Sequence, residues 1–262
     1  SLKACLEPHG YGVMVMTSHD SRAGEVRATE LLSQRKMDAL IVAPCKGERD
    51  ASRLDAIAET GTPVVMIDRW LPSRNCLSVA TDNATGAELA TRHLLELGHQ
   101  RIGVVRARFA CSSTRERLAG YRKALQSFGV KYDPDLVVSP NYNIGRDHYV
   151  EAGDLLSTLL SVPSPPTALF VFHDAIAVGV MSAAAKLHLR VPEDLSLVGY
   201  DDIEVVKYLP VPLTTIAQDK RALGQTAGDF VLRSLRGEAI AQRDVRLAPK
   251  LVVRQSTCRL AS

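Results

Sequence analysis

The chain lacks the features that mark disulfide-rich and membrane proteins. Its five cysteines show no CxxC spacing and are odd in number, so we expect free thiols rather than a disulfide framework. No apolar run approaches the ~18 residues that a membrane-spanning helix needs. The N-terminus has no basic segment followed by an apolar one, as a signal peptide would. We therefore expect a soluble, cytoplasmic protein that does not contact a membrane.

Sequence signatures of several enzyme classes are also missing. The chain has no GxGxxG, GxxxxGK(S/T), HExxH or GxSxG motif, and its seven histidines never pair at metal-ligand spacing. Asp82 and Asp201 could flank a glycosidic bond as an acid and a base. A site that only binds a sugar needs carboxylates as well, so this pair does not indicate catalysis. We expect no enzymatic activity, no metal and no cofactor.

The charge of the chain is nearly balanced. It has 32 basic and 29 acidic residues, which gives a formal net charge of +3. The basic side chains are scattered through residues 22–36, 101–122 and 233–254 and do not form one basic face. Direct binding of nucleic acid by this segment is therefore not indicated.

Short apolar segments alternate with helix-like segments along most of the chain. We expect strands at residues 13–16, 39–42, 64–67, 77–80, 102–105, 136–138, 169–172, 195–198 and 251–253. We expect the end of a helix at 2–8 and helices at 23–34, 49–59, 84–97, 115–128, 146–160, 175–187 and 222–235. Strands that alternate with helices form parallel sheets through right-handed crossovers. The sequence thus predicts a doubly wound α/β fold, divided into two lobes of roughly a hundred residues each.

Acidic side chains follow several of the expected strands. The most informative example is the buried run Leu195 to Val198, which ends in Gly199-Tyr200-Asp201-Asp202. Asp68 and Asp82 lie at comparable positions. In open α/β sheets, ligands bind at the carboxyl ends of strands. We therefore expect the functional chemistry at these strand ends.

Several strings together resemble one protein family. They are Asp82-Asn83 with the helix end HLLELGH (93–99), RERLAGY (115–121), VPEDLSLVGYDD (191–202), PLTTI (212–216) and LVVRQST (251–257). In this order and spacing, from about Leu6 to Thr257, they are similar to the effector-binding domain of LacI/GalR-type transcription regulators. Each string alone would be weak, but their joint occurrence is specific.

The resemblance implies a periplasmic-binding-protein-like fold of type I, with two lobes joined by a multi-strand hinge. The expected N-terminal lobe holds residues 1–82 and 219–246, and the C-terminal lobe holds 83–218 and 247–262. The chain starts inside what should be the first helix of the family. The family's first strand and its DNA-binding helix-turn-helix are therefore expected to be absent from this chain.

The resemblance also implies a function. The chain is expected to be the ligand-sensing and dimerisation domain of a transcriptional regulator, a repressor, that binds a small polar effector between its lobes. The effector is expected to be a sugar, a sugar derivative or a purine. Operator DNA would be bound through an N-terminal domain outside this chain. A homodimer is expected, through helix 222–235 or the surroundings of Cys45 and Trp70. The alternative is a periplasmic sugar-binding protein of a transporter.

Two ligand-binding residues are implied most directly. Arg117 matches an arginine whose planar fork binds ligand hydroxyls or a carboxylate, and the alternative is a solvated helix residue. Asp201 matches an acidic residue that accepts hydrogen bonds from two adjacent hydroxyls of a sugar or from the donors of a purine. Asp202 is expected to cap the helix that follows it.

Further candidates carry open alternatives. Asp68 and Asp82 are expected either to touch the ligand or to have a structural role, which for Asp82 is the cap of helix 84–97. Tyr142 and Phe172 could line the site or pack in the core. Gln218 lies at a second crossover between the lobes and is expected to report their closure.

One departure from the family pattern concerns ligand choice. His173 replaces the asparagine that the family commonly has before the aspartate, here Asp174, which is expected to cap the next helix. Histidine is larger than asparagine and can be charged near neutral pH. A sugar that fits a site with the family's asparagine therefore need not fit this site.

Overall fold

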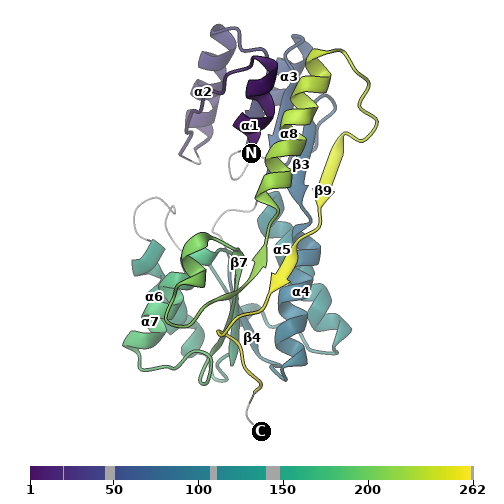
Figure 1. Ribbon diagram of the computed structural model, residues 1–262. Coiled ribbons are helices and arrows are strands. Elements are labelled where there is room, and N and C mark those ends of the chain that lie inside the picture. Colours follow the sequence, from purple (N-terminus) through teal and green to yellow (C-terminus); the bar gives the residue numbers. More distant parts are fainter. Residues whose placement is uncertain (20, 45–50, 107–110, 140–147, 261–262) are drawn as a thin grey trace. The chain divides into compact units, whose positions relative to one another are not determined.

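The computed structural model describes residues 1–19, 21–44, 51–106, 111–139 and 148–260, and it divides into two compact units (Figure 1). Unit 1 consists of Ser1–Asp82, Phe109–Ser113 and Asp219–Ala248. Unit 2 consists of Asn83–Arg108, Thr114–Gln218 and Pro249–Ser262. Each unit contains its own sheet with parallel strands and helices, which confirms the predicted α/β class.

The sheet of unit 1 has four parallel strands in the order β1-β2-β3-β9. These are β1 (Leu40–Val42), β2 (Val64–Ile67), β3 (Leu77–Thr81) and β9 (Asp244–Leu247). The helices of this unit are α1 (Leu2–Leu6), α2 (Arg22–Gln34), α3 (Ser52–Glu59) and α8 (Lys220–Leu235), and the single turn η1 (Glu7–His9) follows α1. Helix α8 packs on β2, β3 and α1, and its Phe230 and Val231 are buried against Val65 and Val79 (Figure 1).

The strand predicted at residues 13–16 does not form. The four apolar side chains Val13, Met14, Val15 and Met16 are 39 to 83% exposed, and the segment has irregular backbone. Strand β1 is the edge of the sheet, and no strand in the part of the chain that the structure describes pairs with residues 13–16. An apolar run needs a neighbouring strand to satisfy its backbone N–H and C=O groups, so this run stays irregular.

The sheet of unit 2 has six strands in the order β10-β8-β7-β6-β4-β5, all parallel except β10, which runs antiparallel to β8. They are β4 (Ile102–Val105), β5 (Val137–Val138), β6 (Ala168–Val171), β7 (Ser196–Asp201), β8 (Thr214–Ala217) and β10 (Lys250–Val252). The helices are α4 (Asn83–Glu96), α5 (Ser112–Ser127), α6 (His148–Leu160) and α7 (Asp174–Lys186), with single turns η2 (Pro134–Leu136) and η3 (Glu204–Lys207).

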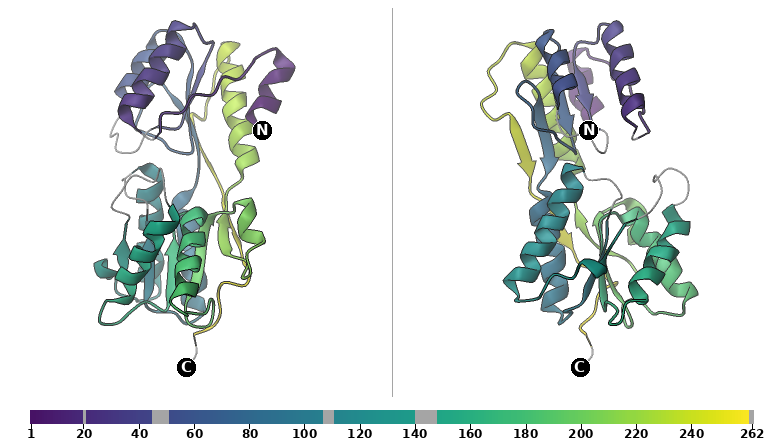
Figure 2. Two further views of the ribbon diagram at one scale, coloured as in Figure 1. Left: turned by 90° about the vertical axis from the view of Figure 1, so that its left-hand side faces the viewer. Right: turned by 180° about the vertical axis from the view of Figure 1, so that it is seen from behind.

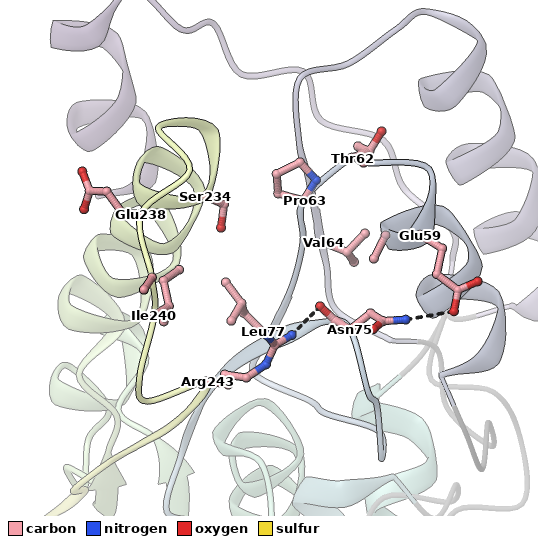
Figure 3. Close-up of a pocket in the computed structure, with 13 residues that line it drawn as sticks. Glu59, Thr62, Pro63, Val64, Asn75, Leu77, Ser234, Glu238, Ile240 and Arg243 are labelled. Atoms are coloured by element: carbon pink, nitrogen blue, oxygen red, sulfur yellow. Dashed lines mark hydrogen bonds between the residues drawn. The ribbon is translucent and has the colours of Figure 1, made fainter.

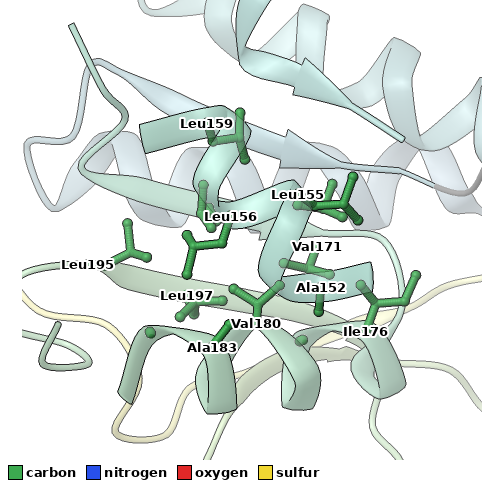
Figure 4. Packing of buried hydrophobic residues seen from close by; sticks show 14 of the residues in the cluster. Ala152, Leu155, Leu156, Leu159, Val171, Ile176, Val180, Ala183, Leu195 and Leu197 are labelled. Carbon is green, nitrogen blue, oxygen red and sulfur yellow. The ribbon is translucent and has the colours of Figure 1, made fainter. Parts of the chain in front are cut away.

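Helices cover both faces of this sheet, as a doubly wound fold requires (Figures 1 and 2). On one face α4 and α5 pack on the sheet through a cluster that includes Leu94, Tyr121 and Phe170. On the other face α6 and α7 bury a second cluster, whose members include Leu156, Val171, Val180 and Leu197 (Figure 4). Strands β4 and β6 are buried on both faces and appear in the sequence as continuous apolar runs, which is why both were predicted.

No helix of the described residues is both long enough and apolar enough to cross a bilayer.

Candidate functional site

Polar side chains meet at the carboxyl ends of three neighbouring strands of unit 2. Asp201 is the last residue of β7, Gln218 directly follows β8, and His173 lies two residues beyond β6. Gln218 Nε2 donates a hydrogen bond of 2.6 Å to Asp201 Oδ1, and His173 Nδ1 lies 3.3 Å from Asp201 Oδ2. Because adjacent parallel strands end at the same edge of a sheet, residues far apart in sequence surround one carboxylate.

Arg117 on α5 completes this group, which we call the Asp201 cluster (Asp201, Arg117, His173 and Gln218). The Arg117 side chain is 2% exposed, and its Nη2 lies 3.6 Å from Asp201 Oδ1. Its Nε donates to Asn83 Oδ1 at 2.9 Å and its Nη1 donates to the carbonyl of Phe172. The guanidinium carbon lies 3.5 Å from the centroid of the Tyr200 ring, a cation–π contact. The alternative of a solvated helix residue is wrong, because Arg117 is buried and held on several sides.

Asp201 is the ionised acceptor of the cluster. Burial by itself would raise the pKa of its carboxyl, but the hydrogen bond from His173 and the charge of Arg117 outweigh burial and hold the pKa below its ordinary value. The side chain is 21% exposed, so a ligand can reach it. Its backbone has φ +114° and that of Asp202 has φ +45°. Such conformations cost about 1 to 3 kcal/mol each and concentrate at functional sites.

The residues beside Asp201 in the sequence explain why this strand end is built as it is. A Cβ atom on Gly199 would lie 2.1 Å from Asp174 Oδ1, so only glycine lets the start of α7 approach β7 this closely. Tyr200 lies under the Arg117 guanidinium. In the string Gly199-Tyr200-Asp201, the glycine thus leaves room for the Asp174 carboxylate and the tyrosine supports the Arg117 guanidinium. Asp201 presents its own carboxylate at the end of β7.

The cap predicted at Asp174 is wrong. His173 occupies the N-cap position of α7 and makes no side-chain cap bond. Asp174 is wholly buried, and its carboxylate accepts hydrogen bonds from Thr215 Oγ1 at 2.6 Å and from the Ile203 N–H at 3.0 Å. These partners lie 41 and 29 residues away in the sequence, so tertiary contacts replace the local cap.

The cap predicted at Asp202 is wrong for the same reason. Ile203 is the N-cap of η3, without a side-chain cap bond. Asp202 Oδ1 instead accepts a 2.6 Å hydrogen bond from Arg254 Nη2. Arg254 also donates to the carbonyl of Leu213 at 2.7 Å, so the C-terminal string is tied to the strand end that carries Asp201.

The buried carboxyl of Asp174 predicts a pH-dependent stability. Burial raises its pKa from an ordinary 3.8 to about 7, even though hydrogen bonds from Thr215 and Ile203 oppose the shift. Between about pH 4 and pH 7 the folded protein keeps a proton that the unfolded chain has lost. The free energy of unfolding should therefore fall as the pH rises through this window, by roughly a few kcal/mol, and level off above it. Urea unfolding at several pH values checks this, because Asp174→Asn should remove most of the slope and an unchanged slope would contradict the assignment.

Two predicted site residues belong to unit 1 and are described with that unit alone. Asp68 follows β2 with φ +65°, its side chain is 43% exposed, and Arg69 Nε lies 3.8 Å from its Oδ2. Asp82 follows β3, is half-buried, and its main-chain N–H donates to the carbonyl of Leu247 at 2.8 Å. Ligand contact by either residue stays a prediction.

The two predicted aromatic contacts fare differently. Tyr142 lies outside the described residues. The Phe172 side chain is wholly buried, with its ring centroid 5.0 Å from that of Phe170, which fits the core packing left open as the alternative to lining the site. Phe172 contributes through its main-chain carbonyl, which holds Arg117.

Two contributions were not predicted from the sequence. Asn83, the first residue of α4, fixes the Nε of Arg117, and it stands in a string that the family resemblance already contained. In unit 1, the Arg246 guanidinium lies 4.8 Å from the centroid of the Trp70 ring, and the main-chain N–H of Trp70 donates to Ser112 Oγ at 3.0 Å. No local pattern marks these contacts, because their partners are distant in sequence.

A hollow lies in unit 1 at the amino ends of β2 and β3, with a volume of about 470 Å³ (Figure 3). Arg243 Nη2 donates to the carbonyl of Asn75 at 2.6 Å, and Asn75 Nδ2 donates to Glu59 Oε1 at 3.0 Å. These polar groups bond to one another, and the hollow lies at the ends of the strands where ligands of this fold class do not usually bind. Within the described residues, no three His, Cys, Asp or Glu side chains gather as a metal site would require.

Comparison with known proteins places this geometry in a family. Residues 91–257 match the family model of the periplasmic binding protein-like domain. The ribose operon repressor of Escherichia coli K12 is 33% identical over 256 residues, which cover 97% of this chain and 75% of that protein. The HTH-type transcriptional repressor PurR of Aliivibrio salmonicida is 30% identical over 252 residues, covering 96% of this chain and 74% of that protein.

Solved structures agree with the sequence relatives. A putative ribose operon repressor from Burkholderia thailandensis superposes with a TM-score of 0.84 at 27% identity, covering 96% of this chain and 90% of that one. A LacI family transcriptional regulator from Enterococcus faecium with bound ribose gives a TM-score of 0.83 at 26% identity, covering 99% and 92%. The chain therefore belongs to the LacI family of transcriptional regulators, of which it forms the periplasmic binding protein-like, effector-binding domain.

Proposed function

We propose that the Asp201 cluster binds a small neutral polar effector, a sugar or sugar derivative, and that this effector controls the binding of operator DNA by the regulator. The observation that carries the proposal is the ionised, partly exposed carboxylate of Asp201 at a strand end. A carboxylate only accepts hydrogen bonds, and sugar hydroxyls are donors that match it. Arg117 is less suited to hold an anionic group of the ligand, because its N–H groups already face Asn83, Phe172 and Asp201.

The relatives support a sugar. Several are named ribose operon repressors, one solved relative contains ribose, and another is a regulator in complex with cellobiose. A purine, such as hypoxanthine, is the second candidate, since donors on a purine could also reach Asp201. These relatives are transcription regulators, so the alternative of a transporter's binding protein is not favoured. The match covers 75% of the Escherichia coli repressor, so we propose that operator binding resides in a segment outside the matched region and that the regulator acts in the cytoplasm.

A ligand panel tests the proposal. Thermal unfolding is followed with D-ribose, D-glucose, cellobiose and hypoxanthine. A ligand at 100 times its Kd adds about 2.7 kcal/mol to the free energy of unfolding, which corresponds to a rise in Tm of roughly 5 to 10 °C for a domain of this size. A shift with at least one sugar supports the proposal. Shifts with hypoxanthine alone would replace the sugar by a purine, and no shift with any of the four would contradict the function.

The same panel separates binding from catalysis. We infer that the domain is not an enzyme, because its relatives are transcription regulators. A sugar recovered after long incubation with the protein should be chemically unchanged by NMR. Formation of a product in proportion to the protein concentration would contradict this inference.

We infer that the domain forms a homodimer through unit 2. The predicted interface on helix 222–235 is not supported, because the apolar residues Phe230 and Val231 of α8 are buried within unit 1. Unit 2 instead exposes Val205 (48%), Tyr208 (76%) and Val253 (57%). The segments that carry these residues are joined by hydrogen bonds, since Arg254 donates to Asp202 Oδ1 and the Gln255 N–H donates to the carbonyl of Pro212. Exposed apolar side chains that gather on one surface mark interaction sites.

Of the other interface positions predicted from the sequence, Cys45 lies outside the described residues, and Trp70 is half-buried beneath Arg246. Replacing Tyr208 by glutamate should therefore weaken self-association at least about tenfold, because a charge would be buried at the contact. Analytical ultracentrifugation measures this change. Leu187→Glu is the control, since Leu187 is also exposed in unit 2 (47%) but lies on α7's C-terminal end. Equal effects of both substitutions, or none from Tyr208→Glu, would contradict this interface.

A further inference from the structure

His173 is the member of the Asp201 cluster whose ring exists in both a neutral and a protonated form. Its side chain is 33% exposed, and its Nδ1 lies 3.3 Å from Asp201 Oδ2. The ring makes no cap bond to the start of α7, although the residue occupies the N-cap position. Its polar contact in the described structure is thus with the carboxylate that we propose binds the effector.

The charged groups around His173 come from several elements. Asp201 on β7 contacts it directly, and Arg117 on α5 faces the other oxygen of that carboxylate. Asp174 is the next residue on α7, but its carboxyl is buried and bonded to Thr215. Asp202 is paired with Arg254. When His173 is neutral, the charges of Arg117 and Asp201 cancel, and when it is protonated the cluster carries one positive charge.

Two hydroxyls of a sugar must compete for the oxygens of Asp201, because three partners already face it. A carboxylate has about four acceptor positions. Gln218 and Arg117 face Oδ1, and His173 faces Oδ2. Arg117 is buried and held by three other contacts, so it cannot yield its place, whereas His173 is partly exposed and can move. A protonated imidazole forms a charge-assisted hydrogen bond that is roughly twice as strong as a neutral one. Displacement of His173 by a neutral hydroxyl is therefore harder when the ring is protonated.

We propose that His173 is a specificity-determining residue that makes the affinity for a neutral sugar depend on proton binding: the neutral ring lets sugar hydroxyls reach Asp201, and the protonated ring competes with them. This inference rests on the proposed function of the cluster. An anionic sugar derivative would respond in the opposite direction, because the protonated ring would add a positive charge to the site. Affinity that falls at low pH thus indicates a neutral ligand, and affinity that rises at low pH indicates an anionic one.

Isothermal titration calorimetry with D-ribose, D-glucose and cellobiose tests the proposal at pH 5.5, 6.5, 7.5 and 8.5. For a sugar that binds, the Kd of the unmodified protein should rise about tenfold from pH 8.5 to pH 5.5, across the range in which histidine side chains titrate. His173→Asn keeps an amide donor for Asp201 but carries no charge, so its Kd should vary by less than about twofold. His188→Asn is the matched control, because His188 is an exposed histidine of the same unit, and it should keep the full pH dependence.

Each result decides between the hypotheses. Asp174, whose carboxyl also titrates near pH 7, is retained in His173→Asn, so a slope that persists in this variant would come from elsewhere and would overturn the proposal. A pH-independent Kd in the unmodified protein would overturn it as well. Tighter binding at low pH would show that His173 does not compete with the ligand. Failure of all three sugars to bind any of the proteins at any pH would instead contradict the proposed function itself.

Discussion

Replacing Asp201 with asparagine should weaken sugar binding at least about a hundredfold. The substitution removes the charge and turns one acceptor oxygen into an amide that must donate. Hydrogen bonds to charged groups contribute about 1.5 to 3 kcal/mol each, and two sugar hydroxyls would lose such a bond. Calorimetry with the sugar that gives the largest thermal shift measures the change in Kd.

The control for this substitution is Asp194→Asn. Asp194 is in the same unit but forms an exposed ion pair with Arg190, which touches nothing in the cluster. Its Kd for the sugar should stay within about twofold of the unmodified protein. Circular dichroism should show both variants folded at the temperature of the titration. A Kd for Asp201→Asn within about threefold of the original would remove Asp201 from the site.

Replacing Arg117 with methionine should lower the free energy of unfolding by about 3 to 5 kcal/mol. The change leaves the buried acceptors of Asn83 and Phe172 without their donor and leaves Asp201 without its cation. Removing one partner of a buried ion pair has a large cost, because the remaining charge stays in a poorly solvated place. Urea unfolding followed by circular dichroism gives the difference.

Helix α5 supplies a matched control on its exposed side. Arg122 also stacks on a tyrosine, with its guanidinium carbon 4.3 Å from the Tyr132 ring and a 3.0 Å hydrogen bond to the Tyr132 hydroxyl. It is exposed, so Arg122→Met should cost less than about 1 kcal/mol. Comparable losses for the two substitutions would mean that Arg117 does not hold the strand ends together.

These two experiments distinguish positioning from binding. Arg117 has little contact with solvent and fixes the Asp201 carboxylate, so its loss should mainly lower the free energy of unfolding. The Asp201 side chain is accessible, so its loss should mainly weaken sugar binding. If Asp201→Asn destabilised the domain as much as Arg117→Met, the carboxylate would have a structural role instead.

The sequence predicted most of the buried strands, because a strand that is buried on both faces appears as a continuous apolar run. Strands β2 and β4 are continuous apolar runs flanked by turn residues, and both were predicted with their actual bounds. Strands β8 and β9 were not predicted. The sequence of β9, Asp-Val-Arg-Leu, is half polar because it forms the edge of its sheet. The run at 13–16 shows the opposite error: a strand was predicted there and none forms, because apolar character alone does not provide a partner strand.

The residues of the candidate site likewise divide into those that could be predicted from the sequence and those whose roles could not. Asp201 and His173 could be predicted together, because each follows a predicted strand and parallel strands end at a common edge. Gln218 was predicted only as a crossover residue, because the strand before it, β8, was not predicted. The roles of Asp174 and Asp202 could not. Each precedes a helical segment, where local rules favour a cap, but Thr215 and Arg254 bond to them from distant parts of the chain. Which donor bonds to a carboxylate depends on the tertiary fold, and one sequence does not show it.

A crystal structure of the domain with D-ribose, or with the sugar that binds most tightly, tests the central claim most directly. The account predicts two sugar hydroxyl oxygens within about 3 Å of the Asp201 carboxylate, with His173 or Gln218 moved from its present contact. A sugar bound only elsewhere, for example in the hollow of unit 1 beside Arg243 (Figure 3), with Asp201 still holding all its partners, would contradict the account.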